Sequence, residues 1–358
     1  MRNISTRQQF LFSLVLLIFI FGGSRLVSQS QESVREAVPL IEPYAQFEHT
    51  DHVDSVVFHP DGRMLVSKSF RDGVRLSDVF TGGLWRTFRP RGFSAISISF
   101  SHSGDTLAIG CNDGKVRLLD GLTLAVTMTL PVMKWGIYAL AFSNDDQTLA
   151  CDAPGGTMQI WNLRTGKFIR SIGVRGPESM AGVAFSPDDK VVAVVNRQGR
   201  VNVWEISTGK PLGTLPEYSH QNTIAFCNDG RLAIGRGGGI RLWDYRDSST
   251  ELRIAMPDSL RPPEPVPNAR GELPPGNGLQ PPRQTFLSAD CETAATVTDG
   301  GNIAIWFVRT RVLQQMLNAG SLGLTMGGSD VASVSFSSDG QWLASGNFNG
   351  KVALWRLK

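Results

Sequence analysis

Two short stretches, Phe185-Ser-Pro-Asp-Asp189 and Val201-Asn-Val-Trp204, decide the fold because versions of both recur seven times along the chain. The first is a large apolar residue followed by a small polar turn. The second is a quartet whose first and third residues are apolar, the period of two expected of a β-strand with one buried face. The turns begin at Phe58, Phe100, Phe142, Phe185, Phe226, Leu287 and Phe336. The quartets end at Ser77, Leu119, Trp161, Trp204, Trp243, Trp306 and Trp355.

The spacing of these copies predicts a repeat protein. Successive quartet ends are 42, 42, 43 and 39 residues apart, and two longer intervals of 63 and 49 residues contain insertions. No stretch has the pattern of a long amphipathic helix, and the 38 glycines suit many turns between short strands. A period near 40 residues with several strands per unit is typical of a β-propeller.

The repeats resemble the WD-repeat family, in which a tryptophan closes the third strand of a four-stranded blade. The segment His49-Thr-Asp-His-Val53 also resembles the start of such a repeat. The resemblance covers about residues 41–358 and implies an all-β, seven-bladed propeller of antiparallel blades. It also implies blade-anchoring roles for Trp161, Trp204, Trp243, Trp306, Trp355, His49, Asp72 and Asp113. No repeat keeps the family's full set of His, Ser or Thr, Asp and Trp, so apolar packing between sheets should supply most of the stability.

The two ends of the chain are predicted to meet. The seventh repeat stops after its third strand, and the segment Tyr44-Ala-Gln-Phe47 has no other assignment. We expect this N-terminal segment to complete the last blade as its outer strand, which pairs an otherwise open sheet edge.

Residues 1–30 read as a secretory signal. Arg2 and Arg7 precede an apolar run from Phe10 to Phe21, and small residues follow it. The run is short for a membrane span, although an uncleaved anchor is the alternative. Residues 31–40 are then a tether to a propeller at 41–358. The expected location is outside the cytoplasm, periplasmic or secreted, or membrane-anchored through the N-terminal segment if that is not cleaved.

Charge and cysteine content narrow the partners. The net charge is +3 with both signs mixed along the chain, so we expect no nucleic-acid partner and no membrane contact beyond the N-terminal segment. Export would permit disulfides, but Cys111, Cys151, Cys227 and Cys291 are too scattered for a stapling framework. We expect four small, semi-buried thiols.

No catalytic, metal-binding or cofactor-binding motif is present. The five histidines and four cysteines do not form a metal-ligand spacing, and Gly235-Arg-Gly-Gly-Gly239 precedes a strand instead of the helix that a phosphate loop needs. The chain is therefore predicted to be a non-enzymatic, monomeric scaffold for unidentified protein partners. The alternative is a small-molecule binder or enzyme that uses the central channel, comparable to TolB-type envelope propellers.

Two insertions mark a distinctive edge of the ring. Residues 257–283 contain nine prolines, which cannot join a sheet, and residues 318–330 are rich in glycine. Both lie in links between repeats, at the same edge as the turns between second and third strands. The predicted partner contacts are hairpin tips on this edge and arginines of the proline-rich insertion: Arg71, Asn112, Arg197, Arg236, Asn347, Arg261 and Arg270.

Overall fold

The computed structural model describes residues 39–357, apart from 133–134, 154, 174–179, 198, 217–222, 237–238, 248–250, 261–283, 299–300 and 320–330. The predictions for residues 1–38, among them the signal, therefore lie outside the described part, as do Arg261 and Arg270. In the part that is described, no helix is long and apolar enough to span a membrane.

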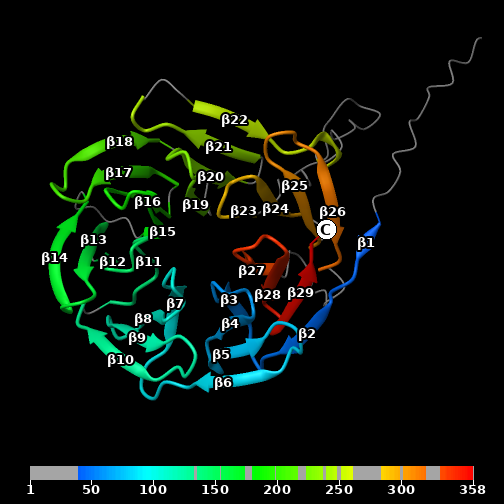
Figure 1. Ribbon diagram of the computed structural model, residues 1–358, viewed down its shortest axis with the longest axis horizontal. Helices are drawn as coiled ribbons and strands as arrows, with labels where there is room; N and C mark the ends of the chain where they lie inside the picture. The colour runs from blue at the N-terminus through cyan, green and yellow to red at the C-terminus, as the bar shows by residue number, and fades with distance from the viewer. Residues whose placement is uncertain are drawn as a thin grey trace, which may run out of the picture. The chain divides into compact units, whose positions relative to one another are not determined.

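Seven sheets follow one another around a ring in chain order, so the chain is a seven-bladed, all-β propeller as predicted (Figure 1). Blade 1 contains β3 (Val53–Phe58), β4 (Met64–Ser69), β5 (Gly73–Asp78) and β6 (Leu84–Phe88), and blade 2 contains β7 (Ala95–Phe100), β8 (Thr106–Cys111), β9 (Val116–Asp120) and β10 (Val126–Leu130). Blade 3 contains β11 (Leu140–Phe142), β12 (Thr148–Ala153), β13 (Thr157–Asn162) and β14 (Lys167–Ile172), and blade 4 contains β15 (Met180–Phe185), β16 (Val191–Asn196), β17 (Val201–Glu205) and β18 (Pro211–Leu215).

The remaining blades contain the N-terminal strands. Blade 5 contains β19 (Thr223–Phe226), β20 (Leu232–Arg236), β21 (Gly239–Trp243) and β22 (Glu251–Ala255). Blade 6 contains β23 (Gln284–Leu287), β24 (Thr293–Val297), β25 (Ile303–Phe307) and β26 (Leu313–Leu317) together with β1 (Leu40–Ile41). Blade 7 contains β27 (Val331–Phe336), β28 (Trp342–Asn347) and β29 (Lys351–Arg356) together with β2 (Ala45–Glu48). A short 3-10 helix, η1 (Asp258–Leu260), follows β22.

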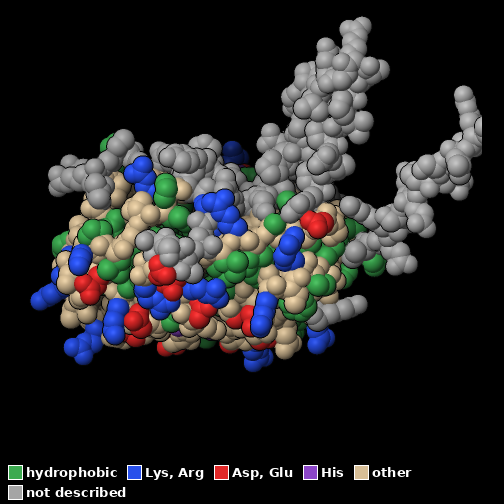
Figure 2. All heavy atoms as spheres, turned by 90° about the horizontal axis from the view of Figure 1, so that it is seen from above, with side chains coloured by type: hydrophobic (Ala, Val, Ile, Leu, Met, Phe, Trp, Pro, Cys, Tyr) green, Lys and Arg blue, Asp and Glu red, His purple; other side chains and the backbone are tan. Residues whose placement is uncertain are grey.

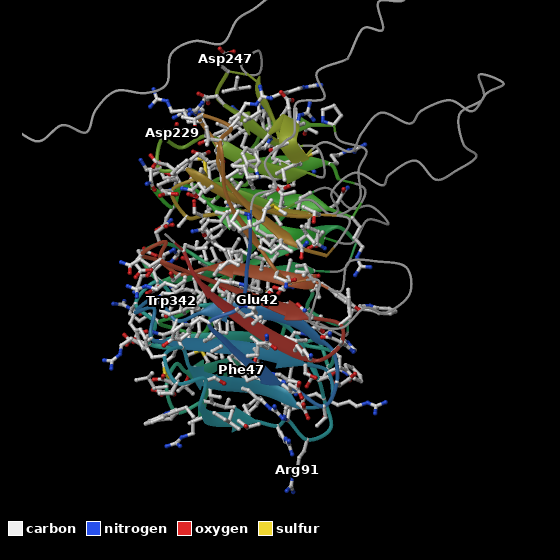
Figure 3. All side chains as sticks on the ribbon, turned by 90° about the vertical axis from the view of Figure 1, so that its right-hand side faces the viewer. Glu42, Phe47, Arg91, Asp229, Asp247 and Trp342 are labelled. Atoms are coloured by element: carbon white, nitrogen blue, oxygen red, sulfur yellow. A yellow bond between two sulfur atoms is a disulfide. The ribbon has the colours of Figure 1, made fainter. Side chains whose placement is uncertain are left out.

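The N-terminal segment closes the ring. β2 pairs antiparallel with β29, with Phe47 opposite Val352, which confirms the predicted outer strand of the last blade. Figure 3 shows this side of the ring, with Phe47 and Trp342 labelled. The two-residue strand β1 also adds a parallel fifth strand to blade 6, so Leu40, assigned from sequence to the tether, already belongs to a sheet.

An apolar core fills each of the seven junctions between neighbouring blades. In six blades the residue that ends the quartet contributes to the junction with the preceding blade: Trp161 packs with residues of blade 2, and Trp204 packs with residues of blade 3. Because the alternate faces of every sheet are covered in this way, burial of apolar surface stabilises each blade mainly through its neighbours.

The turns between first and second strands share one backbone conformation. In all seven blades one turn residue has a positive φ, and this residue is glycine in four blades but Asp146 (58°), Asp189 (56°) and Cys291 (60°) in the other three. Ser143, Ser186 and their counterparts stabilise the turn, since the serine hydroxyl accepts the N–H of the residue five positions on.

The cysteine prediction was wrong for two of the four residues. Cys227 in blade 5 and Cys291 in blade 6 form a disulfide, with their Cα atoms 5.5 Å apart. The pairing could not be inferred from the spacing of the cysteines, because the two residues are 64 positions apart along the chain. Cys111 and Cys151 are free and buried.

Ring closure through β2 yields a test. Replacing Phe47 by aspartate would place a charge against the core between blades 7 and 1, and we expect a loss of about 2 kcal/mol in the free energy of unfolding. Gln46 is on the exposed face of the same strand, so Gln46→Asp should change stability by less than about 0.5 kcal/mol. Urea unfolding of both variants measures this, and equal effects would contradict closure by β2.

Candidate functional site

Two ends of the blades must be distinguished. We call the link rim the end that carries the turns between second and third strands and the links from one blade to the next. The far rim carries the turns between first and second strands and between third and fourth strands. Loops vary more freely than the strands that hold them, so either rim can carry a binding surface.

Exposed aromatic and polar side chains lie on the link rim over blades 2 to 4. Trp135 and Tyr138 belong to the link from blade 2 to blade 3, and Trp135 is 71% exposed. The guanidinium of Arg197, in the second turn of blade 4, lies 5.1 Å from the centre of the Tyr138 ring. Asn112 lies at the neighbouring turn of blade 2. We call these four residues the rim cluster.

Backbone contacts hold the rim cluster in place. The Asn112 side chain accepts the N–H of Ser94 at 2.8 Å, and the N–H of Ile137 donates to the carbonyl of Cys111 at 3.1 Å. Gly136, between Trp135 and Ile137, packs closely on the end of the Ile96 side chain, which would have to move to admit a Cβ there. Hydrogen bonds therefore hold Asn112 and the backbone next to Tyr138 in place.

A buried carboxylate lies beneath this link. Asp152, at the end of β12, accepts the N–H of Tyr138 at 2.9 Å and the N–H of Ala139 at 3.2 Å. Burial outweighs these hydrogen bonds and raises the pKa of Asp152 to about 6. The equivalent position of blade 1 holds Lys68, which is buried, forms an ion pair with Asp54 and has its pKa lowered by burial. Both charges are engaged within the protein.

A second aromatic group lies on the link rim over blades 7 and 1. Phe70 and Phe348 are more than half exposed, and the ring of His52 lies 6.4 Å from that of Phe348. Arg71 is exposed beside them and its Nε lies 3.6 Å from the Asp51 carboxylate.

A buried Ser–His–Asp chain in blade 1 is not a catalytic triad. His49 Nε2 is 2.7 Å from Ser67 Oγ, and His49 Nδ1 is 3.4 Å from Asp72 Oδ2. Ser67 is 0% exposed, so its hydroxyl cannot reach a substrate. Burial and the nearby Arg75 lower the pKa of His49 to about 4. The chain is a structural network that joins the link before β3 to blade 1.

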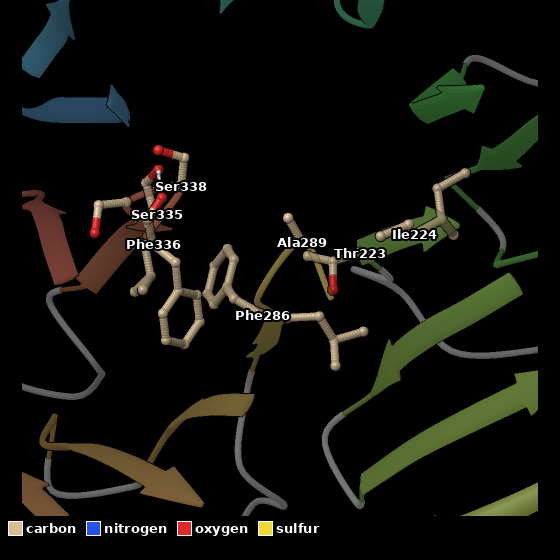
Figure 4. A pocket seen from close by; sticks show the side chains of 11 residues that line it. Thr223, Ile224, Phe286, Ala289, Ser335, Phe336 and Ser338 are labelled. Carbon is tan, nitrogen blue, oxygen red and sulfur yellow. Dashed lines mark hydrogen bonds between the residues drawn. The ribbon is translucent and has the colours of Figure 1, made fainter. Parts of the chain in front are cut away.

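The central channel contains a small pocket between the inner strands of blades 5 to 7 (Figure 4). Its volume is about 290 Å³, and Phe286 and Phe336 project side by side into it. The lining hydroxyls of Thr223 and Ser338 already donate to the carbonyls of Thr285 and Pro60. The pocket has no charged lining residue among those described, and no group of three His, Cys, Asp or Glu is placed for a metal within the described ranges.

Comparison with known proteins agrees with this architecture. The family model for the WD domain, G-beta repeat, matches residues 41–74, 84–120 and 320–356. The chain is a WD40-repeat propeller. It is similar to SEC12-like protein 1 of Arabidopsis thaliana, with 27% identity over 133 residues, 35% of this chain and 33% of that protein. It is also similar to COMPASS component SWD3 of Saccharomyces cerevisiae, with 25% identity over 136 residues, 36% of this chain and 43% of that protein.

A third relative is the WD repeat-containing protein SL1-17 of Schistosoma mansoni, with 30% identity over 122 residues, 34% of this chain and 40% of that protein. The WD40-repeat propeller thus matches between a third and about two fifths of the length of these curated relatives. Members of the family generally act as scaffolds for protein interaction and are usually non-catalytic.

Some of the contact residues predicted from the sequence are exposed on the WD40-repeat propeller, and one of them is buried. Arg71, Asn112 and Arg197 are exposed on the link rim. Arg236 ends β20 at this rim, and only its backbone is described. The prediction for Asn347 is wrong, because its side chain is 0% exposed and accepts a hydrogen bond from Ser345. β28 extends through Asn347, so the exposed turn begins one residue later, at Phe348.

The predicted blade anchors divide into two groups. All five third-strand tryptophans are buried, and the indole N–H of Trp306 donates to Thr296 while that of Trp355 donates to the carbonyl of Ile41. His49 and Asp72 form the network described above. Asp113 instead accepts two hydrogen bonds from Arg117, whose guanidinium lies 3.5 Å from the centre of the Phe93 ring.

Trp135 and Tyr138 were missed in the sequence. A signal was present: Trp135 lies between repeats, whereas five of the eight tryptophans close third strands. A tryptophan between repeats lies outside the positions that the fold reuses, and tryptophan is enriched at protein interfaces, which makes Trp135 a candidate for contact with a partner.

Two buried groups should oppose each other as the pH falls. The pKa of His49 is about 4 in the native protein and 6.5 in the unfolded chain. Below pH 6.5 the unfolded chain therefore binds a proton that the native protein does not, so a fall in pH destabilises the fold. With a pKa of about 6, native Asp152 accepts a proton before the unfolded chain does, so acid stabilises the fold down to about pH 4.

Single variants should separate these effects. When the pH is lowered from 7 to 4.5, the free energy of unfolding of Asp152→Asn should fall by about 2 kcal/mol more than that of the wild type. Over the same pH range the free energy of unfolding of His49→Gln should fall by about 2 kcal/mol less than that of the wild type. Urea unfolding at the two pH values measures this. Parallel pH profiles of all three proteins would show that neither group is perturbed as described.

Proposed function

We propose that this WD40-repeat propeller is an extracytoplasmic scaffold that binds protein partners through the link rim, with the rim cluster at the centre of the contact. The observation that carries the proposal is the exposed pair of Trp135 and Tyr138 with Arg197 against the tyrosine ring. Tryptophan, tyrosine and arginine are the side chains most enriched where protein interfaces gain their affinity. The hydrogen-bonded backbone at residues 137–139 lowers the entropy that Tyr138 loses on binding.

The extracytoplasmic location is supported by two independent features. The sequence of residues 1–30 has the composition of a secretory signal, cleaved or retained as an anchor. The Cys227–Cys291 disulfide is of a kind that persists in oxidising compartments and is rare in the cytosol. Periplasmic and secreted locations fit both features equally well.

The alternative, a small molecule in the central channel, is supported only by the 290 Å³ pocket. Its size is at the lower limit for ligand sites, and two of its hydroxyls are already used within the protein. The charged and nucleophilic groups that catalysis needs are absent from its described lining. The rim proposal therefore has the stronger physical basis.

Substitutions in the rim cluster should test the binding surface. The full chain and its Trp135→Ala and Tyr138→Ala variants would be immobilised and exposed to the envelope and secreted fractions of the source cell. For a partner retained by the wild type, we expect each variant to bind about 30-fold more weakly, since a buried interface aromatic contributes about 2 kcal/mol.

The chain provides a matched control. Trp85 on β6 is 56% exposed and has Arg86 5.3 Å from its ring centre, but it lies on an outer strand and not on the link rim. Trp85→Ala should leave retention unchanged. Equal retention by all the folded variants would contradict a rim-centred contact. Loss of retention in Trp85→Ala alone would move the contact to the outer strands.

A further inference from the structure

Neighbouring blades are joined at the far rim by contacts between equivalent turn positions. The carboxylate of Asp146 in blade 3 accepts the N–H groups of His102 and Ser103 in blade 2, at 2.6 and 2.8 Å. The carboxylate of Asp189 in blade 4 repeats this contact with Asn144 and Asp145 of blade 3, at 2.7 and 2.9 Å. The residue of positive φ in one turn thus holds the turn of the preceding blade.

The junction of blades 1 and 2 uses the same two positions with different chemistry. His59 occupies the position that is serine in most turns, and its Nε2 lies 3.1 Å from the carbonyl of Gly104, the residue of positive φ in blade 2. A Cβ on Gly104 would collide with the His59 ring, so the two positions are in direct contact.

The disulfide occupies these two positions at the junction of blades 5 and 6. Cys227 replaces the turn serine of blade 5, and Cys291 is the residue of positive φ in blade 6, equivalent to Asp146 and Asp189. A covalent bond therefore stands where the junctions of blades 2 with 3 and of blades 3 with 4 have a carboxylate and two N–H groups.

The junction of blades 5 and 6 also differs from the others in its link and in its surface. The link between blades 5 and 6 contains the proline-rich insertion at 257–283. Between the two blades lies a groove of about 1050 Å³, lined by both cysteines together with residues such as Leu252, Phe307 and Arg311. The groove lies beside the disulfide, and an apolar core that includes Leu242 and Trp306 packs the same junction.

We propose that Cys227–Cys291 is a redox-sensitive clip that replaces the carboxylate contact and holds blade 5 against blade 6. It forms when the two thiols lose two protons and two electrons to a disulfide-bearing oxidant, which leaves as two thiols. Reduction by a dithiol reverses the exchange. The reduced junction has neither a covalent bond nor a carboxylate at this point, so the blades separate more easily there than at any junction held by aspartate.

The other two cysteines are poor competitors for this exchange. Cys111 and Cys151 lie within β8 and β12, and both are fully buried. Burial raises the pKa of the Cys111 thiol to about 11 and raises that of Cys151 as well. Because the thiolate is the reacting species, the pairing of Cys227 with Cys291 should be the one that forms.

Thiol mapping tests the bond itself. The full chain, isolated without reductant and unfolded in the presence of an alkylating agent, should show Cys111 and Cys151 alkylated and the Cys227 and Cys291 peptides linked. After reduction with dithiothreitol all four should be alkylated. Four free thiols in the unreduced protein, or any other pairing, would overturn the proposal.

Stability measurements test the clip. We expect reduction to lower the wild-type melting temperature by about 3–6 °C. Cys227→Ser with Cys291→Ser should melt as the reduced protein does, and Cys227→Ser with Cys291→Asp should recover part of the loss, because aspartate can accept the N–H groups of residues 228 and 229. Neither variant should respond to reductant. Identical melting of oxidised and reduced wild type would overturn the proposal.

Hydrogen exchange locates the effect. Reduction should speed exchange in the turns at 227–231 and 288–292, whereas the turns at 143–147 and 186–190, held by Asp146 and Asp189, provide internal controls that should not change. Equal acceleration in all four turns would show a global loss of stability and would contradict a local clip.

Discussion

The structure depends on closure of the ring. Each blade exposes two apolar faces that only its neighbours can cover, so an open arc of blades would leave a core exposed at both ends. Closure is achieved with strands from opposite ends of the chain: β2 pairs with β29, and the carbonyl of Ile41 accepts hydrogen bonds from Asn318 in the link after blade 6 and Trp355 in blade 7. The N-terminal segment thereby joins the last two blades and completes the sheet beside blade 1.

A closed ring separates stability from recognition. The apolar junctions and a few buried polar contacts, such as His49 with Ser67 and Asp152 with the N–H of Tyr138, fix the strands and the bases of the links. Trp135, Tyr138 and Arg197 lie beyond those bases, at positions where side chains can change without loss of packing in the core. On the face shown in Figure 2 the charged side chains are mixed in sign, as the net charge of +3 suggested, so an aromatic contact distinguishes the rim better than an electrostatic field does.

The sequence predicted what repeats and missed what does not. Periodic turns and quartets located seven blades, and the missing last strand identified Tyr44–Phe47 as its replacement. The two-residue strand β1 has no periodicity to detect, and the burial of Asn347 depends on how far β28 extends. Cys227 and Cys291 occupy different positions in the turns of adjacent repeats, and only the structure showed that these two positions touch across a junction. Residues of the rim cluster come from blade 2, from the link between blades 2 and 3 and from blade 4, and sequence spacing does not show that Arg197 lies on the Tyr138 ring.

Hydrogen exchange of the N-terminal strand in the free protein tests ring closure most directly. The structure predicts that the paired amides of residues 45–48 exchange as slowly as those of β29, and that both strands lose protection together on addition of urea, because they form one sheet in a cooperative unit. Exchange of residues 45–48 at the rate of an unstructured peptide, while β28 and β29 stay protected, would contradict the account, since the ring would then remain stable without its closing strand.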